Sequence, residues 1–179
     1  MLTIRQGTLE DFEAVLEFYT KMIDEMKDTE FDVYWEHDKH PSKAFIRTSL
    51  EQDRVYLGWV TRDDGEEELA CGMIVNADGA LGYEQVEWGC NVAPDDLGVL
   101  HVVATLPCYH GQGFAKQLLA WVIEQERARG TRVLRLDTFP FNVRGRGLYE
   151  ALGFKHRGDT TLTYPALGEV VLSMYELIL

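Results

Sequence analysis

Residues 99–137 contain a strand, a turn, a helix and a second strand in that order, and this order constrains the fold more than any other feature. Residues 99–105 (VLHVVAT) are apolar and β-branched apart from His101, which is typical of a strand buried on both faces. A helix over 113–130 and a strand over 133–137 follow. Strands joined through a crossover helix pair in parallel, so the pattern predicts an α/β protein.

Apolar periodicity and turn residues predict the remaining elements. Helices are expected over 8–26, 42–52 and 144–152, and strands over 2–5, 55–61, 69–75, 83–88, 154–163 and 169–177. Charged Glu124/Arg127 and Glu126/Arg129 pairs are expected on the outer face of the central helix. No repeat or linker divides the 179 residues, so one domain over 1–179 is predicted.

Charge and composition exclude several classes of function. The chain has 17 basic and 30 acidic residues, a formal charge of -13, which argues against nucleic acid as a partner and favours a cationic small molecule. No apolar run approaches the roughly 18 residues of a spanning helix, so we expect a cytoplasmic protein with no membrane partner. Cys71, Cys90 and Cys108 have neither disulfide nor zinc spacing, and no metal is predicted.

Two glycines, Gly111 and Gly113, lie between the apolar strand and the helix. Glycine lets a backbone approach a ligand closely, and free N–H groups at a helix N-terminus attract anions. The glycine loop, residues 110–116, is therefore a candidate phosphate site. Its spacing matches neither of the common nucleotide-binding patterns, and a tight turn is the alternative interpretation.

Two motifs in this sequence resemble the GNAT superfamily of N-acetyltransferases. Residues 110–115 (HGQGFA) resemble the acyl-CoA loop Q/R-x-x-G-x-G/A, with His110 in place of Gln or Arg. Residues 142–154 (NVRGRGLYEALGF) resemble the segment N-x-x-A-x-x-L-Y-E-x-L-G-F, with Gly145 in place of Ala. The outer elements follow the same order as in the family, so the resemblance covers essentially the whole chain.

The resemblance implies a mixed central sheet, mostly antiparallel, with a splayed parallel strand pair at its centre and helices on both sides. It also implies acetyl-CoA as the acyl donor, with its pantetheine arm on the central strand and its pyrophosphate on the glycine loop. The residues implied in CoA binding are Val103, Ala104, Thr105, His110, Gly111, Gln112, Gly113, Phe114, Ala115, Lys116, Asn142 and Tyr149. Asn142 has a second interpretation as the cap of the following helix.

The family's tyrosine beside the CoA sulfur corresponds to Tyr149, which would donate a hydrogen bond or a proton to the leaving thiolate. A primary amine has a pKa near 10, so a base must remove a proton before the amine attacks. Asp137, at the end of a cleft strand, and Glu87, on the predicted strand before the central one, are the candidate bases. His101 is a third candidate, with a buried structural histidine as the alternative.

Other residues have a functional and a structural interpretation side by side. Tyr34, Trp35 and Trp88 would form an aromatic wall for a cation, or pack beneath loops. Arg144 and Arg146 would reach the 3′-phosphate of CoA, or lie on a solvated helix face. The sequence thus predicts an N-acetyltransferase acting on a small-molecule amine. The alternatives are a peptide or lysine acceptor and a CoA-binding module with little transfer activity, and a homodimer is compatible with each.

Overall fold

The computed structural model describes residues 1–30, 32–52, 54–164 and 168–179. The chain forms two compact units and contributes two segments to each. The first unit contains Met1–Val75 and Val102–Val122, and the second contains Asn76–His101 and Ile123–Leu179. Strand β4 (Leu97–Thr105) and helix α3 (Phe114–Arg129) each contribute residues to both units.

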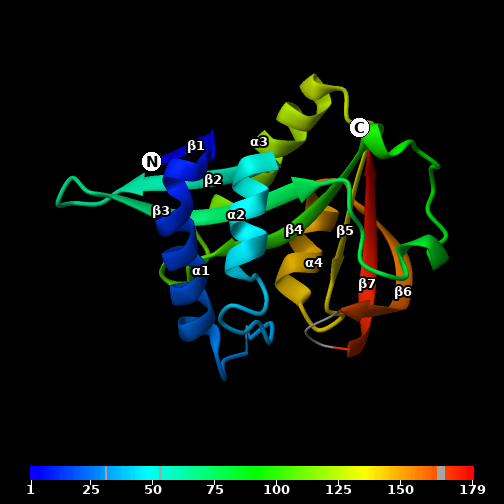
Figure 1. Cartoon of the computed structure of the whole chain (residues 1–179), viewed down its shortest axis with the longest axis horizontal. Helices are drawn as coiled ribbons and strands as arrows, with labels where there is room; N and C mark the ends of the chain where they lie inside the picture. Colours follow the sequence, from blue (N-terminus) through cyan, green and yellow to red (C-terminus); the bar gives the residue numbers. More distant parts are fainter. Residues whose placement is uncertain (31, 53, 165–167) are drawn as a thin grey trace. The chain divides into compact units, whose positions relative to one another are not determined.

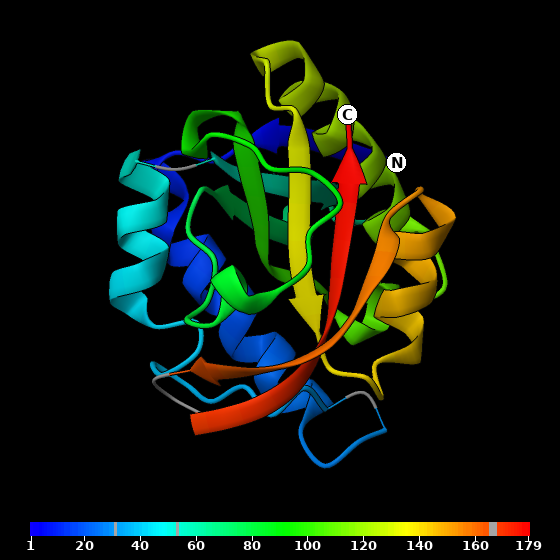
Figure 2. The ribbon, with the colours of Figure 1, turned by 90° about the vertical axis from the view of Figure 1, so that its right-hand side faces the viewer.

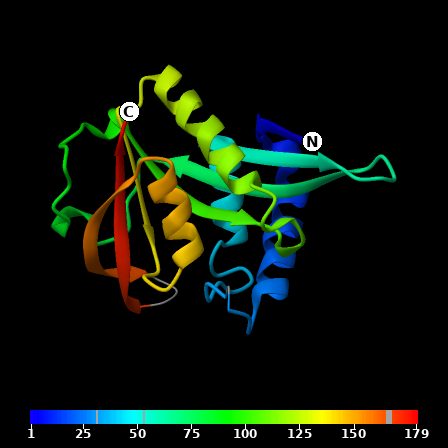
Figure 3. The same ribbon diagram turned by 180° about the vertical axis from the view of Figure 1, so that it is seen from behind.

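The first unit is built on strands in the order β1-β2-β3-β4. Strands β1 (Leu2–Gln6), β2 (Arg54–Thr61) and β3 (Glu67–Asn76) pair antiparallel, and each includes the residues predicted to form a strand. Helices α1 (Phe12–Met26) and α2 (Lys43–Gln52) cover one face of these strands, whereas α3 begins on the opposite face (Figures 1 and 3).

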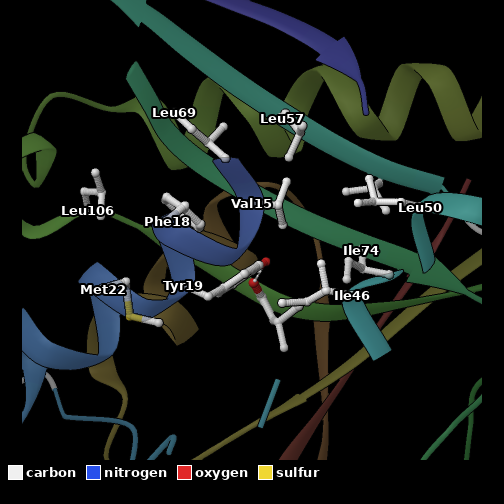
Figure 4. Packing of buried hydrophobic residues seen from close by; sticks show 12 residues of the cluster. Val15, Phe18, Tyr19, Met22, Ile46, Leu50, Leu57, Leu69, Ile74 and Leu106 are labelled. Carbon is white, nitrogen blue, oxygen red and sulfur yellow. Dashed lines mark hydrogen bonds between the residues drawn. The ribbon is translucent and has the colours of Figure 1, made fainter. Parts of the chain in front are cut away.

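Local signals start both helices of the first unit. Helix α1 follows the 3₁₀ turn η1 (Leu9–Asp11), where the Thr8 N–H donates to the Asp11 carboxylate at 2.8 Å. Helix α2 begins after Ser42, whose hydroxyl accepts the Phe45 N–H at 3.1 Å. Their apolar faces join the strands in one cluster (Figure 4). The cluster contains Val15, Phe18, Tyr19, Met22, Ile46, Leu50, Val55, Leu57, Leu69, Ile74, Val102 and Leu106.

The second unit carries the strand order β4-β5-β7-β6. The first residues of β4 pair in parallel with β5 (Val133–Thr138), with Leu97 opposite Val133 and Val99 opposite Arg135. Strands β6 (Lys155–Tyr164) and β7 (Gly168–Ile178) are antiparallel, and β7 is antiparallel to β5. Figure 2 shows these strands with helix α4 (Val143–Ala151) beside them. The mixed, mostly antiparallel sheet with one parallel pair is confirmed.

Two local predictions are wrong. The expected strand over 83–88 is instead the 3₁₀ turn η2 (Tyr83–Gln85) followed by irregular chain, because Gly82, with a φ of +109°, starts a turn in which the Gln85 N–H donates to the Gly82 carbonyl at 3.0 Å. Glu126 is not on the outer face of α3, where the Glu126/Arg129 pair is predicted. It is fully buried and accepts a hydrogen bond from the Thr131 hydroxyl at 2.7 Å, whereas the Glu124–Arg127 ion pair is present.

The cluster of the first unit predicts the effect of a core truncation. Ile46 is fully buried, so Ile46→Ala should lower the free energy of unfolding by about 3 kcal/mol through lost burial and a residual cavity. Urea denaturation followed by circular dichroism measures this change. Leu9→Ala is the control. Because Leu9 is 46% exposed, this substitution should lower the free energy of unfolding by less than about 0.5 kcal/mol. Equal costs would show that this cluster does not stabilise the fold.

Candidate active site

The glycine loop has a backbone conformation that requires its two glycines. Strand β4 ends at Thr105, and the 3₁₀ turn η4 (Pro107–Tyr109) leads into the loop. Gly111 and Gly113 have φ values of +78° and +76°, a region that L side chains rarely occupy. A Cβ at either position would meet no atom within 4 Å, so backbone conformation rather than crowding selects glycine here.

Backbone donors converge at the start of α3. The first helical hydrogen bond runs from the Gln117 N–H to the Gly113 carbonyl at 3.0 Å, so the preceding amides have no carbonyl to pair with inside the helix. Among the residues that the structure describes, the N–H groups of Gly111, Gly113, Phe114, Ala115 and Lys116 have no hydrogen-bond partner. Their dipoles add to that of the helix, so this loop is suited to an anion.

His110, which replaces the family's Gln or Arg, is turned toward the end of β4. Its Nε2 lies 3.0 Å from the Thr105 carbonyl oxygen, and since a carbonyl only accepts, Nε2 is the donor. The ring therefore bridges the strand end and the loop. The Thr105 hydroxyl is buried, and no hydrogen-bond partner for it exists among the residues described.

Strand β4 changes direction at Val102. Its φ of +46° is a strained conformation for a β-branched residue and costs on the order of 1–3 kcal/mol. The Tyr19 hydroxyl from α1 donates to the Val102 carbonyl at 2.8 Å and helps to hold this conformation. Burial raises the pKa of Tyr19, so the hydroxyl remains a donor at neutral pH. The half-buried residues 103–105 follow this bend.

Turn η4 is connected to strand β3 and helix α1 through side chains. The Tyr109 hydroxyl donates to Glu68 Oε2 at 2.6 Å, and Lys21 Nζ lies 2.7 Å from Glu68 Oε1. Lys21, together with the Tyr109 hydrogen bond, lowers the pKa of Glu68. Burial and the Glu68 carboxylate raise the pKa of Tyr109 to about 12. Sequence reasoning missed this contact, because 41 residues separate Glu68 from Tyr109.

In the second unit, Asp137 lies near the end of β5 and accepts a hydrogen bond from the Tyr83 hydroxyl at 2.7 Å. Tyr83 is nearly buried, and its ring packs against Trp88 with centroids 5.3 Å apart. The Trp88 indole N–H donates back to the Tyr83 carbonyl at 2.9 Å. Tyr83 therefore holds the carboxylate of a predicted base. This contact has no signal in the sequence, which predicts a strand rather than a turn at Tyr83.

Tyr149 lies on α4 and is 6% exposed. Its ring packs against Phe154 and Tyr175, with centroids 6.0 and 5.9 Å away. Burial first, and then the negative charge of Asp137, raise the pKa of this phenol. Tyr149 therefore stays protonated at neutral pH and can act as a hydrogen-bond donor.

Asn142 caps helix α4. Its Oδ1 accepts the Gly145 N–H at 3.0 Å, and its Nδ2 donates to the Thr138 hydroxyl at 3.0 Å. A Cβ at Gly145 would lie 2.6 Å from Asn142 Nδ2. An alanine at position 145 would therefore require the Asn142 side chain to shift.

Three other residues with predicted functional roles are Glu87, His101 and Trp88. Glu87 is exposed and lies in irregular chain rather than on a strand. His101 is half-buried rather than buried, with Nε2 2.8 Å from Asn76 Oδ1. Trp88, predicted as part of an aromatic wall for a cation, has the Arg135 guanidinium 4.2 Å from its ring centroid. Arg135 therefore stacks on one face of the Trp88 ring.

Trp35 of the predicted aromatic wall and Arg146 of the predicted 3′-phosphate site both contact other residues of the protein. In the first unit Trp35 packs against Tyr19 and His40, whereas Tyr34 is 59% exposed. Arg146 donates to the Pro140 carbonyl at 2.9 Å and to the Tyr175 hydroxyl at 3.0 Å. These two bonds give Arg146 a structural role within the second unit.

No group of three or more His, Cys, Asp or Glu residues in the described ranges is arranged to hold a metal ion. None of the helices described is long and apolar enough to cross a membrane.

Comparison with known proteins identifies the family. Residues 12–154 match the acetyltransferase (GNAT) family. The chain belongs to this family. The matched range includes the glycine loop and the 142–154 segment, and the mixed, mostly antiparallel sheet matches that of GNAT fold neighbours.

Individual GNAT relatives are distant. An uncharacterized N-acetyltransferase of Methanocaldococcus jannaschii is 24% identical over 155 residues, covering 87% of this chain but only 61% of the relative. An aminoglycoside N(6')-acetyltransferase type 1 of Salmonella typhimurium is 33% identical over 103 residues, 51% of this chain and 70% of the relative. The structure of yncA from Salmonella typhimurium with its cofactor acetyl-CoA superposes with a TM-score of 0.64 at 17% identity, covering 99% and 94% of the two chains.

The Glu68 contacts predict a pH-dependent contribution to stability. A carboxyl whose folded pKa is depressed stabilises the fold above its unfolded pKa, about 4.3, and loses that contribution as pH falls through the folded value. Glu68→Gln should therefore lower stability by about 1 kcal/mol at pH 7 and by much less at about pH 3. Urea midpoints at both pH values measure this, and a pH-independent difference would contradict it.

Proposed function

We propose that this chain transfers the acetyl group of acetyl-CoA to an amine of a small molecule by direct attack, with residues 1–179 acting as one acyltransferase domain. The observation that carries the proposal is the set of unpaired backbone donors in the glycine loop. Membership of the GNAT family and the acetyl-CoA in the yncA structure support acetyl-CoA as the acyl donor.

The glycine loop has the chemistry that a pyrophosphate needs. Its N–H groups supply several donors to one anion, and the exposed Gly111 and Gly113 leave space where a side chain would stand. Lys116 in the first turn adds a positive charge. We propose that the pyrophosphate binds here, and that the amides of the pantetheine arm pair with the backbone of residues 103–105.

The transfer needs a proton acceptor and a group that stabilises the leaving sulfur. Asp137 takes a proton from the ammonium group, the neutral amine forms the C–N bond with the thioester carbon, the C–S bond breaks, and the nitrogen then loses its second proton to water to give the neutral amide. A backbone N–H near Ala104 polarises the carbonyl oxygen. Tyr149 donates a hydrogen bond to the departing thiolate, which then takes a proton from water. The raised pKa of Tyr149 supports hydrogen bonding over full proton transfer.

Asp137 is favoured over Glu87 as the base. Asp137 is half-buried and accepts a hydrogen bond from the Tyr83 hydroxyl, and its negative charge contributes to the raised pKa of Tyr149. Glu87 is exposed and lies in irregular chain. A small amine as acceptor is supported by the similarity to an aminoglycoside acetyltransferase over half of the chain, and the net charge of -13 favours a cationic one.

The glycine loop is tested by a matched pair of substitutions at the two ends of α3. Gly113 and Gly130 both have positive φ, +76° and +99°, and both would place a Cβ in open space. Gly113→Trp should weaken acetyl-CoA binding at least tenfold in calorimetry by obstructing the loop, whereas Gly130→Trp should not. Absence of binding by the wild-type protein would refute the proposed donor.

Tyr149→Phe should lower kcat about 100-fold, because the leaving thiolate loses its hydrogen bond. The dissociation constant of acetyl-CoA should change by less than about threefold. Thiol release in the presence of a panel of amines measures the rate. A wild-type protein that binds acetyl-CoA but releases no thiol with any amine would instead identify a CoA-binding module.

Asp137→Asn should lower kcat about 100-fold with acetyl-CoA affinity retained, because the amine is no longer deprotonated. Glu87→Gln is the matched control and should leave kcat within about twofold. Tyr83→Phe should give an intermediate loss of about tenfold, since Asp137 then keeps its charge but loses its orientation. A larger effect of Glu87→Gln than of Asp137→Asn would reverse the assignment of the base.

A further inference from the structure

Three side chains from three elements of the first unit form a chain of polar contacts next to the glycine loop. Lys21 of α1 pairs with one oxygen of Glu68 on β3, and Tyr109 of η4 donates to the other oxygen. The Glu68 side chain is 22% exposed and that of Lys21 is 39% exposed. Because both carboxylate oxygens have a partner, Glu68 is fixed relative to β3 and can fix the tyrosine in turn.

Tyr109 also contacts the loop that follows it. Its ring centroid lies 5.6 Å from that of Phe114, the first residue of α3. Its carbonyl accepts the Gln112 N–H in a long contact of 3.4 Å. Tyr109 therefore connects β3, through Glu68, to Gln112 between the two glycines and to Phe114 after the second glycine.

A loop with two glycines in left-handed conformations has more backbone freedom to lose than other loops of its length. Ligand affinity falls by the free energy needed to order such a loop, unless the protein orders it beforehand. Contacts made by flanking residues reduce this cost without touching the ligand.

We infer that Tyr109 is a positioning residue of the glycine loop, and that its hydrogen bond to Glu68 holds the loop amides in the arrangement that binds a pyrophosphate. This inference rests on the proposed function, because acetyl-CoA is the pyrophosphate ligand it concerns. It assigns to Tyr109 and Glu68 a contribution to donor affinity that neither side chain makes by direct contact. The Phe114 ring contact alone is the competing explanation, in which the hydroxyl is dispensable.

Tyr109→Phe separates the two explanations, because it keeps the ring and removes the hydroxyl. Binding is measured by calorimetry with acetyl-CoA and with S-acetylpantetheine, which has the same thioester arm but no pyrophosphate. Tyr109→Phe should weaken acetyl-CoA binding five- to tenfold and leave S-acetylpantetheine binding unchanged. Glu68→Ala should weaken acetyl-CoA binding similarly, and the double variant should be no weaker than the weaker single one.

Glu67→Gln is the control, because Glu67 is the exposed neighbour of Glu68 on the same strand. It should bind both donors as the wild type does, and all variants are compared at temperatures well below their melting points. If wild-type protein binds no acetyl-CoA, the proposed function fails. If wild type binds it and Tyr109→Phe binds it equally well, only the positioning role fails. Equal losses for both donors would indicate general destabilisation and would also overturn the positioning role.

Discussion

The parallel pairing of β4 with β5 is the constraint on which the rest of the structure depends. Two parallel neighbours cannot be joined by a hairpin, so the chain must return through α3. The crossover starts α3 shortly beyond the C-terminal end of β4, and the unpaired amides of its first turn are therefore exposed there. The glycine loop thus follows from strand pairing before any ligand is considered.

Tyrosine hydroxyls have a recurring role in both units. Tyr19 donates to the strained Val102 carbonyl, Tyr83 to the Asp137 carboxylate and Tyr109 to Glu68. Each hydrogen bond connects a helix or turn to a strand. A phenol suits this role because its ring is buried among apolar groups while its hydroxyl remains a donor at neutral pH.

The sequence was most informative where the signal is local. The apolar run of β4, the two glycines and the 142–154 motif predicted the crossover, the loop and the family, because each depends on neighbouring residues. The Tyr83–Asp137 and Tyr109–Glu68 contacts could not be predicted, since 54 and 41 residues separate the partners. The buried position of Glu126 was missed because helical periodicity does not show which end of a helix is covered. Asn142 had two interpretations, and its contacts with Gly145 and Thr138 show the capping role.

The division of the chain into two interleaved units has a consequence for synthesis on the ribosome. When Val75 emerges, the first unit still lacks Val102–Val122, which includes Val102 and Leu106 of its apolar cluster. The segment Asn76–His101 of the second unit must be made before that cluster can be completed. The nascent first unit therefore exposes apolar surface until about residue 122 has left the exit tunnel, longer than a unit encoded by one continuous segment would.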